Sequence, residues 1–340
     1  MIDLLVAGGG PAGLAAAVCG ALAGMETVVV EPREAPVDKA CGEGVMPGGV
    51  RDLRELGVDL GAAGGRELRG IRYTDGVRSV QAAFRGGPGL GVRRTGLHRA
   101  LWSRAVDLGV RIVPGRVGEV RQTDGAVLAA GWRARWMIAA DGLHSPVRRA
   151  LGLQAPWRGA RRYGLRRHYR VAPWTDFVEV HWSAHGEAYV TPVGEELVGI
   201  AVLSAERRRF DAHLACFPRL APVLSAPAAG PVRGAGPLRQ RVRGRVAGRV
   251  LLAGDAAGYV DALTGEGIAL AVASARAAVD CLAAGRPAAY EAAWRRLSRR
   301  HRLLTGALVR ASGSGRAARL VVPVASRFPV VFGAAVRALR

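Results

Sequence analysis

The chain has 340 residues, half of them apolar, and a formal net charge of +22. This composition excludes a disordered protein and is sufficient for one large domain or two domains in close contact. Lys39 is the only lysine among 49 basic residues, and the arginines are scattered, without a zinc knuckle or an RNA-binding motif, so we expect no nucleic-acid partner.

The cysteines and the hydropathy pattern restrict the cellular setting. Cys19, Cys41, Cys216 and Cys281 have neither metal-ligand nor CxxC spacing, which indicates no metal site and no disulfide framework. The chain opens directly into an apolar strand, without a charged leader and cleavage site, and it has no apolar run of membrane-spanning length. We therefore expect a cytoplasmic protein.

The first predicted elements form a βαβ unit. Residues 2–7 are expected to be a buried strand, residues 11–24 a helix of small residues, and residues 27–30 a second apolar strand. Because two strands joined by a helix lie parallel, this unit predicts a parallel sheet.

The loop after the first strand carries a nucleotide-binding pattern. Gly8, Gly10 and Gly13 satisfy G-x-G-x-x-G between a strand and a helix. Gly8 permits the tight turn, Gly10 lets the backbone approach a pyrophosphate, and Gly13 lets helix and strand pack closely. Glu31 ends the second strand, where its carboxylate can bind the ribose hydroxyls of an adenosine. The predicted site also includes the neighbouring residues Pro11, Ala12, Pro32 and Arg33.

Further along the chain the pattern changes to alternating segments. Residues 66–84 alternate around Thr74-Asp75-Gly76 and predict an antiparallel hairpin. After it we expect a loop, a helix and two strands, at residues 86–91, 95–107, 111–120 and 126–140.

The middle of the chain is expected to be an antiparallel sheet, with strands at residues 177–182, 188–193 and 197–203, and residues 234–237 are expected to form a turn. After residue 250 a buried strand, a glycine-rich loop and an alanine-rich helix follow. The Arg-rich segment 288–340 is expected to be helical and ends in an apolar patch. It predicts either packed terminal helices or peripheral contact with a membrane.

Two further motifs favour FAD over NAD. Asp141-Gly142-Leu143-His144-Ser145 resembles the D-G-x-x-S motif of flavoprotein hydroxylases, and Gly254-Asp255 resembles their G-D motif, whose Asp holds the ribityl or pyrophosphate part of FAD. Backbone N–H groups at the start of the following helix can face the N1/O2 edge of the flavin. The residues expected there are Gly265, Glu266, Gly267 and Ile268.

On these three motifs the chain resembles the para-hydroxybenzoate hydroxylase-type flavoprotein superfamily over nearly its whole length. Cys41-Gly42-Glu43-Gly44 and Thr264-Gly265-Glu266-Gly267 are most similar to its geranylgeranyl-reductase-like branch. The implied fold class is α/β: a Rossmann-type FAD-binding domain, an inserted antiparallel β-sheet substrate domain and C-terminal helices. The expected boundaries are 1–65, 92–160 and 245–287 for the FAD domain, 66–91 and 161–244 for the substrate sheet, and 288–340 for the C-terminal segment.

The resemblance also implies positions for other residues. Arg94 would contact FAD, and Val117 would lie beside the adenine through its backbone. The loop 38–44 would lie beside the isoalloxazine. Its residues Lys39, Cys41, Gly42 and Glu43 would therefore border the active site.

Two reactions compete for this site. Geranylgeranyl reductases carry Y-x-W-x-F-P where residues 187–192 retain only Tyr189 and Pro192. Glu187 and Thr191 would oppose a long prenyl chain, because burying them without partners is unfavourable, whereas a small hydrophobic or aromatic substrate of phenolic or polyketide type could bond to them. We therefore predict an NAD(P)H-dependent monooxygenase. Its catalytic candidates are Cys41, Glu43, Tyr189 and Thr191.

Three alternatives stay open. Gly258 stands where typical hydroxylases have His, so reduction of C=C bonds in a prenyl or other hydrophobic lipid is the second interpretation. Halogenation is less favoured, because the one lysine, Lys39, lies in the loop 38–44 and not in the region where halogenases place theirs. The W-x-W-x-I-P signature of halogenases is also missing. The third is a non-catalytic electron carrier, against which the inserted sheet argues. Only one nucleotide fingerprint exists, so NAD(P)H would be a transient electron donor.

Overall fold

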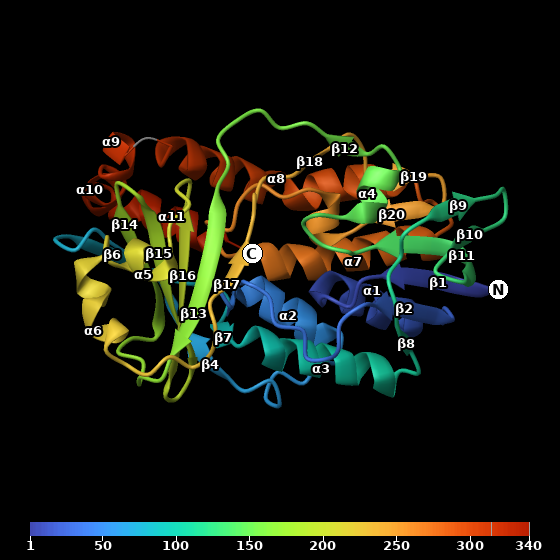
Figure 1. Cartoon of the computed structure of the whole chain (residues 1–340), viewed down its shortest axis with the longest axis horizontal. Helices are drawn as coiled ribbons and strands as arrows, with labels where there is room; N and C mark the ends of the chain where they lie inside the picture. The colour runs from blue at the N-terminus through green and yellow to red at the C-terminus, as the bar shows by residue number, and fades with distance from the viewer. Residues whose placement is uncertain (314, 340) are drawn as a thin grey trace.

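A computed structural model describes residues 1–313 and 315–339 (Figure 1). The chain forms two large sheets that lie side by side. One carries the N-terminal βαβ unit, on the right in Figure 1, and the other is the inserted sheet, on the left, with the C-terminal helices beside it.

The first sheet has eight strands and a parallel centre, as predicted. β1 pairs in parallel with both β2 and β11, and β20 extends the parallel set. β1, β2 and β20 are nearly continuous buried apolar runs, the pattern expected where helices cover both faces of a sheet. In spatial order the strands are β19 (Val246–Ala247), β20 (Val250–Leu252), β11 (Trp132–Ala139), β1 (Ile2–Ala7), β2 (Thr27–Glu31) and β8 (Arg111–Pro114), with β10 (Val127–Ala129) paired to β11 and β9 (Val120–Gln122) to β10.

Helices cover this sheet through small side chains. α1 (Pro11–Leu22) packs between α3 (Arg94–Asp107) and α7 (Gly267–Ala283), and α8 (Ala289–Ala311) lies along α7. Two shorter helices complete this part of the chain. α2 (Pro47–Glu55) comes shortly after the loop 38–44, and α4 (Pro146–Ala150) follows the motif that begins at Asp141. Gly10 and Pro11 begin α1, so its N-terminus opens at the end of β1.

The second sheet has seven strands and two differently covered faces. Its outer face packs against α5 (Phe210–Leu214), the short helix η1 (Pro218–Leu220) and α6 (Ala221–Leu224), and its inner face looks toward the C-terminal helices. In spatial order the strands are β17 (Arg233–Ala235), β13 (Tyr163–Tyr169), β16 (Leu197–Ser204), β15 (Gly186–Gly194), β14 (Phe177–Ser183), β5 (Gly70–Thr74) and β6 (Ser79–Ala83). The pairing is antiparallel except between β14 and β5.

Glycine-rich segments account for two differences from the expected elements. The loop expected at residues 86–91 ends in β7 (Gly89–Val92), which pairs with β3 (Gly44–Val45) and β4 (Gly65–Leu68) in a separate small sheet rather than in the substrate sheet. A Cβ at Gly91 would lie 1.8 Å from the Pro192 carbonyl oxygen, so glycine there permits close packing on β15. The turn expected at residues 234–237 begins in β17.

The two strands expected between residues 111 and 140 are four. The first is divided into β8 and β9 around Gly115, whose φ of +153° breaks the extended run. The second is divided into β10 and β11, because Ala130 and Gly131 both take positive φ values and form a tight hairpin turn.

The C-terminal segment is helical, as predicted. After α8 come α9 (Gly315–Ala318), α10 (Val321–Arg327) and α11 (Pro329–Arg337), and both α10 and α11 pack on β6. Within residues 1–313 and 315–339 no single helix has the length and apolarity to cross a membrane. One helix pair, Gly315–Arg327 with Pro329–Arg337, passes that test jointly but is bent by 99°.

Candidate functional site

The glycine loop between β1 and α1 borders a cavity of about 890 Å³. Gly8 has a φ of +97°, and a Cβ there would lie 2.6 Å from the Ala140 carbonyl oxygen. A Cβ on Gly13 would lie only 1.7 Å from the Gly8 carbonyl oxygen. Gly10 is different, because no atom lies closer to its Cβ position than Arg94 Nη2 at 3.8 Å. Gly8 and Gly13 therefore close the turn, and Gly10 leaves the backbone open to a ligand.

Glu31 lies at the end of β2 and is bonded to the glycine loop. Its Oε2 accepts a hydrogen bond from Gly9 N at 2.6 Å, and Arg33 Nε donates to its Oε1 at 2.7 Å. Burial opposes ionisation of this carboxyl, but the bonds from Arg33 and Gly9 hold its pKa below the ordinary value. His98 Nε2 forms a hydrogen bond of 3.0 Å with the Gly9 carbonyl oxygen and so fixes the glycine loop to α3. The same end of the cavity is lined by Pro11, Ala12, Pro32, Arg33, Arg116 and Val117.

Charged side chains line the next part of the cavity. Asp141 Oδ1 and Arg94 Nη1 are buried and have no hydrogen-bond partner within the described part of the chain. Burial lowers the pKa of Arg94 and of Lys39, and it raises the pKa of Asp141 and of Asp255. Buried polar atoms are normally bonded, so this wall is suited to a polar ligand. The diphosphate and the ribityl hydroxyls of FAD offer matching acceptors and donors, and the residues present therefore fit FAD.

The flavin loop, residues 38–44, is held by buried charges on β13. Glu43 Oε2 lies 2.5 Å from His168 Nε2, and its Oε1 accepts a hydrogen bond from Arg94 N at 2.8 Å. Arg166 bonds to the Asp38 carboxylate and, at 3.0 Å, to the Lys39 carbonyl oxygen. These contacts attach both ends of the loop to the substrate sheet.

The same contacts determine the tautomer of His168. Arg166 Nη1 lies 3.0 Å from His168 Nδ1, and a guanidinium can only donate, so Nδ1 accepts. The ring proton is then on Nε2 and is donated to the Glu43 carboxylate. Glu43 has a φ of +60°, a conformation that is costly for a residue with a side chain. Its bonds to His168 and to Arg94 offset that cost.

All four catalytic candidates line the cavity, but their side chains have distinct roles. Thr191 Oγ1 donates to the Gly42 carbonyl oxygen at 2.8 Å, and Tyr189 donates to the Leu263 carbonyl oxygen at 3.0 Å, so both side chains brace the loops around the flavin site. Cys41 Sγ accepts a hydrogen bond from Glu43 N at 3.3 Å, and burial raises the pKa of its thiol. Cys41 is therefore a protonated thiol on the cavity wall at neutral pH. The fourth candidate, Glu43, lines the cavity but uses its carboxylate within the network around His168.

The turn before α7 also borders the cavity, although not every predicted residue does. Gly265, Gly267 and Ile268 line it. The Glu266 side chain turns away, and its Oε2 lies 3.0 Å from His301 Nδ1 on α8. Gly13 and Gly254 do not line the cavity either. A Cβ on Gly254 would lie 2.6 Å from Ala12 Cβ, so this glycine lets the turn pack on α1.

Beyond the flavin loop the cavity continues as an apolar chamber. It lies between the inner face of the seven-stranded sheet and the C-terminal helices. The chamber is lined by Ile71, Val178, Val180, Leu203, Leu238, Leu308, Phe332, Val336 and Leu339.

The polar residues of β15 do not make this chamber polar. Glu187, which was expected to bond to a substrate, pairs with Arg162 at 2.5 Å, and Arg162 also lies 3.1 Å from Asp261. Thr191 is already bonded to Gly42. Because Glu187 and Thr191 both have protein partners, neither opposes a long apolar substrate as the sequence had suggested.

Three residues of the network around Glu43 were not predicted as site residues: Asp38, which lies in the predicted loop 38–44, and Arg166 and His168 on β13. The alternation of the strand predicts that Arg166 and His168 lie on one face, because they are two residues apart. Nothing local shows that this face is the inner one.

A family model described as "FAD binding domain" matches residues 1–210. The chain is 30% identical over 324 residues to a menaquinone reductase of Mycobacterium tuberculosis, covering 82% of this chain and 76% of that protein. It is 30% identical over 304 residues to digeranylgeranylglycerophospholipid reductase 1 of Methanothermobacter thermautotrophicus, and the match covers 78% of this chain and 73% of that protein. The structure of the flavin-dependent brominase Bmp2 superposes with a TM-score of 0.81 at 19% identity, over 98% of this chain and 89% of the brominase. At this identity the similarity shows the fold alone.

The glycine loop, the Asp141 and Asp255 wall and the inserted sheet define an FAD-dependent oxidoreductase. The chain belongs to the FAD-binding-domain family of the para-hydroxybenzoate hydroxylase-type superfamily, which confirms the resemblance stated from its motifs. Its relatives include the geranylgeranyl-reductase-like proteins.

Proposed function

We propose that this enzyme reduces a carbon–carbon double bond in the prenyl chain of a lipid, such as a prenylated quinone. The observation that supports this most directly is the apolar chamber that continues from the flavin site. Its lining offers dispersion contacts to a long hydrocarbon, and the charge of Glu187 is paired with that of Arg162. The names of the two relatives, a menaquinone reductase and a prenyl-phospholipid reductase, favour the same substrate class. The proposal therefore adopts the second of the sequence-based interpretations in place of hydroxylation.

The residues around the flavin loop suit this reaction. When bound and reduced, FAD supplies the hydride for one carbon of the double bond. Cys41 holds the proton that the other carbon needs, because burial keeps its thiol protonated. Arg94, whose charge favours the thiolate, stabilises Cys41 after the proton has left. The thiol then recovers a proton from solvent. Tyr189 and Thr191 position the two loops.

The C-terminal helices offer a route for a lipid substrate. Phe332 and Val336 of α11 line the chamber, while Val330 and Val331 on the same helix are 77% and 66% exposed. Phe328, between α10 and α11, is 55% exposed. Arginines 316, 319, 327 and 337 lie in the same segment. Exposed apolar residues beside basic ones favour contact with an anionic bilayer, and we propose that the substrate reaches the chamber at this surface.

The test uses the FAD-loaded enzyme, reduced without oxygen by NADPH or by dithionite. It is incubated with a prenylated naphthoquinone, a geranylgeranyl phospholipid and an alkylphenol. The products are reoxidised in air before mass spectrometry, because reoxidation removes the two hydrogens of a quinol but leaves a saturated prenyl bond. We expect a gain of two hydrogens on a prenyl substrate that survives reoxidation. A gain of one oxygen on the alkylphenol, in a parallel incubation with air, would overturn the proposal in favour of hydroxylation.

Matched cysteine variants test the role of Cys41. Cys41→Ala should lower the rate of prenyl reduction at least tenfold, because general acid catalysis contributes about 10²–10⁴-fold. Cys216→Ala is the control, since Cys216 is also half-buried but packs against the outer face of the seven-stranded sheet. Equal rates for the two variants would remove Cys41 from the mechanism.

A further inference from the structure

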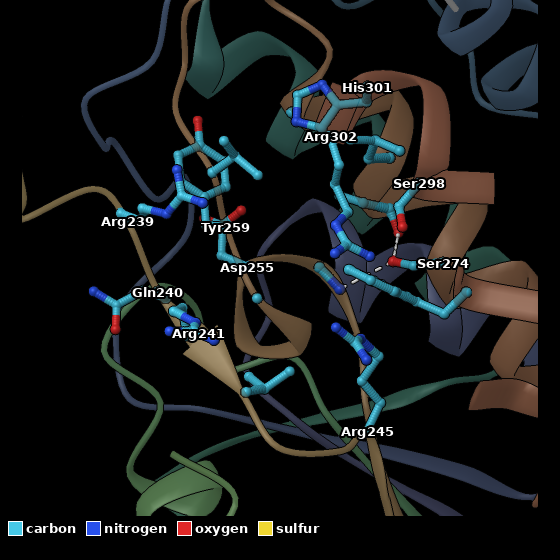
Figure 2. Close-up of a pocket in the computed structure, with 18 residues that line it drawn as sticks. Arg239, Gln240, Arg241, Arg245, Asp255, Tyr259, Ser274, Ser298, His301 and Arg302 are labelled. Carbon is cyan, nitrogen blue, oxygen red and sulfur yellow. Dashed lines mark hydrogen bonds between the residues drawn. The ribbon is translucent and has the colours of Figure 1, made fainter. Parts of the chain in front are cut away.

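A second pocket, of about 200 Å³, adjoins the FAD cavity (Figure 2). The two share a wall that includes Asp255, Tyr259 and Gly267. One side of the pocket is the chain segment 239–245, which contains the short strand β18 (Arg241–Val242). The other side is one face of α8, with Trp294, Ser298, His301 and Arg302 at helical spacing.

Positive charge is concentrated in this pocket. Four arginines line it: Arg239, Arg241, Arg245 and Arg302. Glu291 pairs with one of these four, Arg245, at 2.6 Å, whereas Asp261 pairs with Arg162, which does not line the pocket. Asp255, on the shared wall, is the one carboxylate among the lining residues.

Like charges repel within this group. Burial lowers the pKa of Arg239, and its neighbours Arg310 and Arg241 lower it further. Burial likewise lowers the pKa of Arg245. The nearby charge of Arg302 lowers this pKa further, whereas Glu291 raises it. An anion placed among these groups would relieve the repulsion.

Aromatic rings hold the guanidinium groups in place. The Arg245 guanidinium lies over the Trp294 ring at 3.4 Å from its centroid, and that of Arg302 lies 5.6 Å from the same ring. Arg239 lies over Trp157 at 4.3 Å. Figure 2 shows Arg302 and Arg245 extending toward each other across the pocket, with Arg239 and Arg241 around the Asp255 turn. Stacked guanidinium groups lose less conformational freedom when they bind a ligand.

Two buried polar atoms of the lining lack partners. Arg245 Nε and Ser298 Oγ have no hydrogen bond to any residue that the structure describes, and their side chains belong to residues that are 8% and 2% exposed. Both are donors, and each can bond to an oxyanion.

We propose that this pocket binds a phosphoryl group of a ligand other than FAD. Guanidinium forks match the oxygens of a phosphate, and the adjacent hydroxyl of Ser298 adds a donor. The diphosphate of FAD is assigned to the glycine loop, which does not line this pocket. The volume suits a phosphate or diphosphate but not a prenyl chain. Two sources share this chemistry: the phosphates of a nicotinamide nucleotide and those of a phosphorylated substrate.

The test measures binding of inorganic pyrophosphate to the FAD-loaded enzyme by calorimetry, at fixed ionic strength. Arg302→Gln and Arg241→Gln remove exposed pocket charges without changing the buried pair Arg245–Glu291. Arg300→Gln is the matched control, because Arg300 is an exposed arginine of α8 that does not line the pocket. We expect each pocket variant to raise the Kd about tenfold and the control to leave it unchanged. All variants should keep their FAD.

The outcomes separate the proposal from general attraction to a basic protein. Absence of pyrophosphate binding, or an equal loss in all three variants, would overturn it. Displacement of pyrophosphate by NADPH but not by NADH would identify the 2′-phosphate of the donor, and displacement by both would identify the donor's diphosphate. Displacement by a prenyl diphosphate alone would identify the substrate. Because binding is measured without turnover, failure of the proposed reduction would leave this result intact.

Discussion

Replacement of Gly10 by Val should remove FAD while leaving the fold intact. Gly10 has φ −76° and ψ −177°, a conformation that valine also adopts, and the nearest atom to its Cβ position lies 3.8 Å away. The cost to the apoprotein is then limited to the lost preference for glycine at a helix start, about 1 kcal/mol or less. The new side chain would project into the space where a pyrophosphate meets the start of α1.

The loss of FAD affinity follows from the bonds that this displacement breaks. A hydrogen bond from a backbone N–H to a charged phosphate contributes about 1.5–3 kcal/mol, and a displaced diphosphate loses at least two. The Kd for FAD should therefore rise roughly 10²–10⁴-fold. Gly13→Ala is the contrasting variant, because its Cβ would lie 1.7 Å from the Gly8 carbonyl oxygen. Relieving that overlap requires backbone movement and should cost the apoprotein about 3 kcal/mol.

Two measurements on the apoproteins separate these effects. Urea unfolding gives the stability, and titration with FAD, followed by quenching of flavin fluorescence, gives the Kd. We expect Gly10→Val to unfold like the wild type and to bind FAD weakly, and Gly13→Ala to unfold at lower urea. Wild-type FAD affinity in Gly10→Val, with the fold intact, would refute the placement of the pyrophosphate at this loop.

Three further predictions concern other parts of the molecule. Glu43→Gln should cost about 2–3 kcal/mol of stability and shift the visible spectrum of bound FAD. The reason is that the buried loop loses its ion pair with Arg166 and the charge that strengthens the hydrogen bond from His168. An unchanged spectrum would show that these contacts do not hold the flavin loop. Burial holds the pKa of His98 at about 4, below its value in the unfolded chain. Between these two pKa values the unfolded chain binds a proton that the folded chain does not. The stability of the apoprotein should therefore fall by about 3 kcal/mol from pH 7 toward pH 4. His98→Gln should weaken that fall in urea unfolding, and identical pH profiles would contradict it. The double variant Phe328→Ser with Val331→Ser should lower binding to anionic vesicles several-fold in a flotation assay. Val77→Ser is the control and should not lower it, because Val77 is 87% exposed but lies on the hairpin loop, outside the C-terminal segment. Equal flotation of all proteins would exclude the C-terminal surface as the membrane contact.

The nucleotide-binding half could be predicted from the sequence, because its determinants are local. Gly8, Gly10 and Gly13 act on one turn, and Glu31 lies only one helix and one strand further on. The strands of its parallel sheet are buried on both faces, so each is a short apolar run that needs no knowledge of its neighbours. The FAD motifs at Asp141 and Asp255 follow such strands and were found for the same reason.

The residues around the flavin loop depended on the tertiary structure. Glu43 and His168 are separated by 125 positions, and Thr191 and Gly42 by 149. Whether a polar residue on a strand bonds to a substrate or to the protein depends on what lies opposite it. Glu187 was interpreted as a substrate contact for that reason, and only its ion pair with Arg162 showed otherwise.

The sequence by itself therefore determined the cofactor class, the parallel sheet and the inserted sheet, all of which follow from short-range patterns. Packing decided which face of each strand is the inner one, where the apolar chamber extends, and that arginines from segment 239–245 and from α8 meet beside Asp255. Charge repulsion among those arginines depends on distances in space, and separation along the chain does not report such distances.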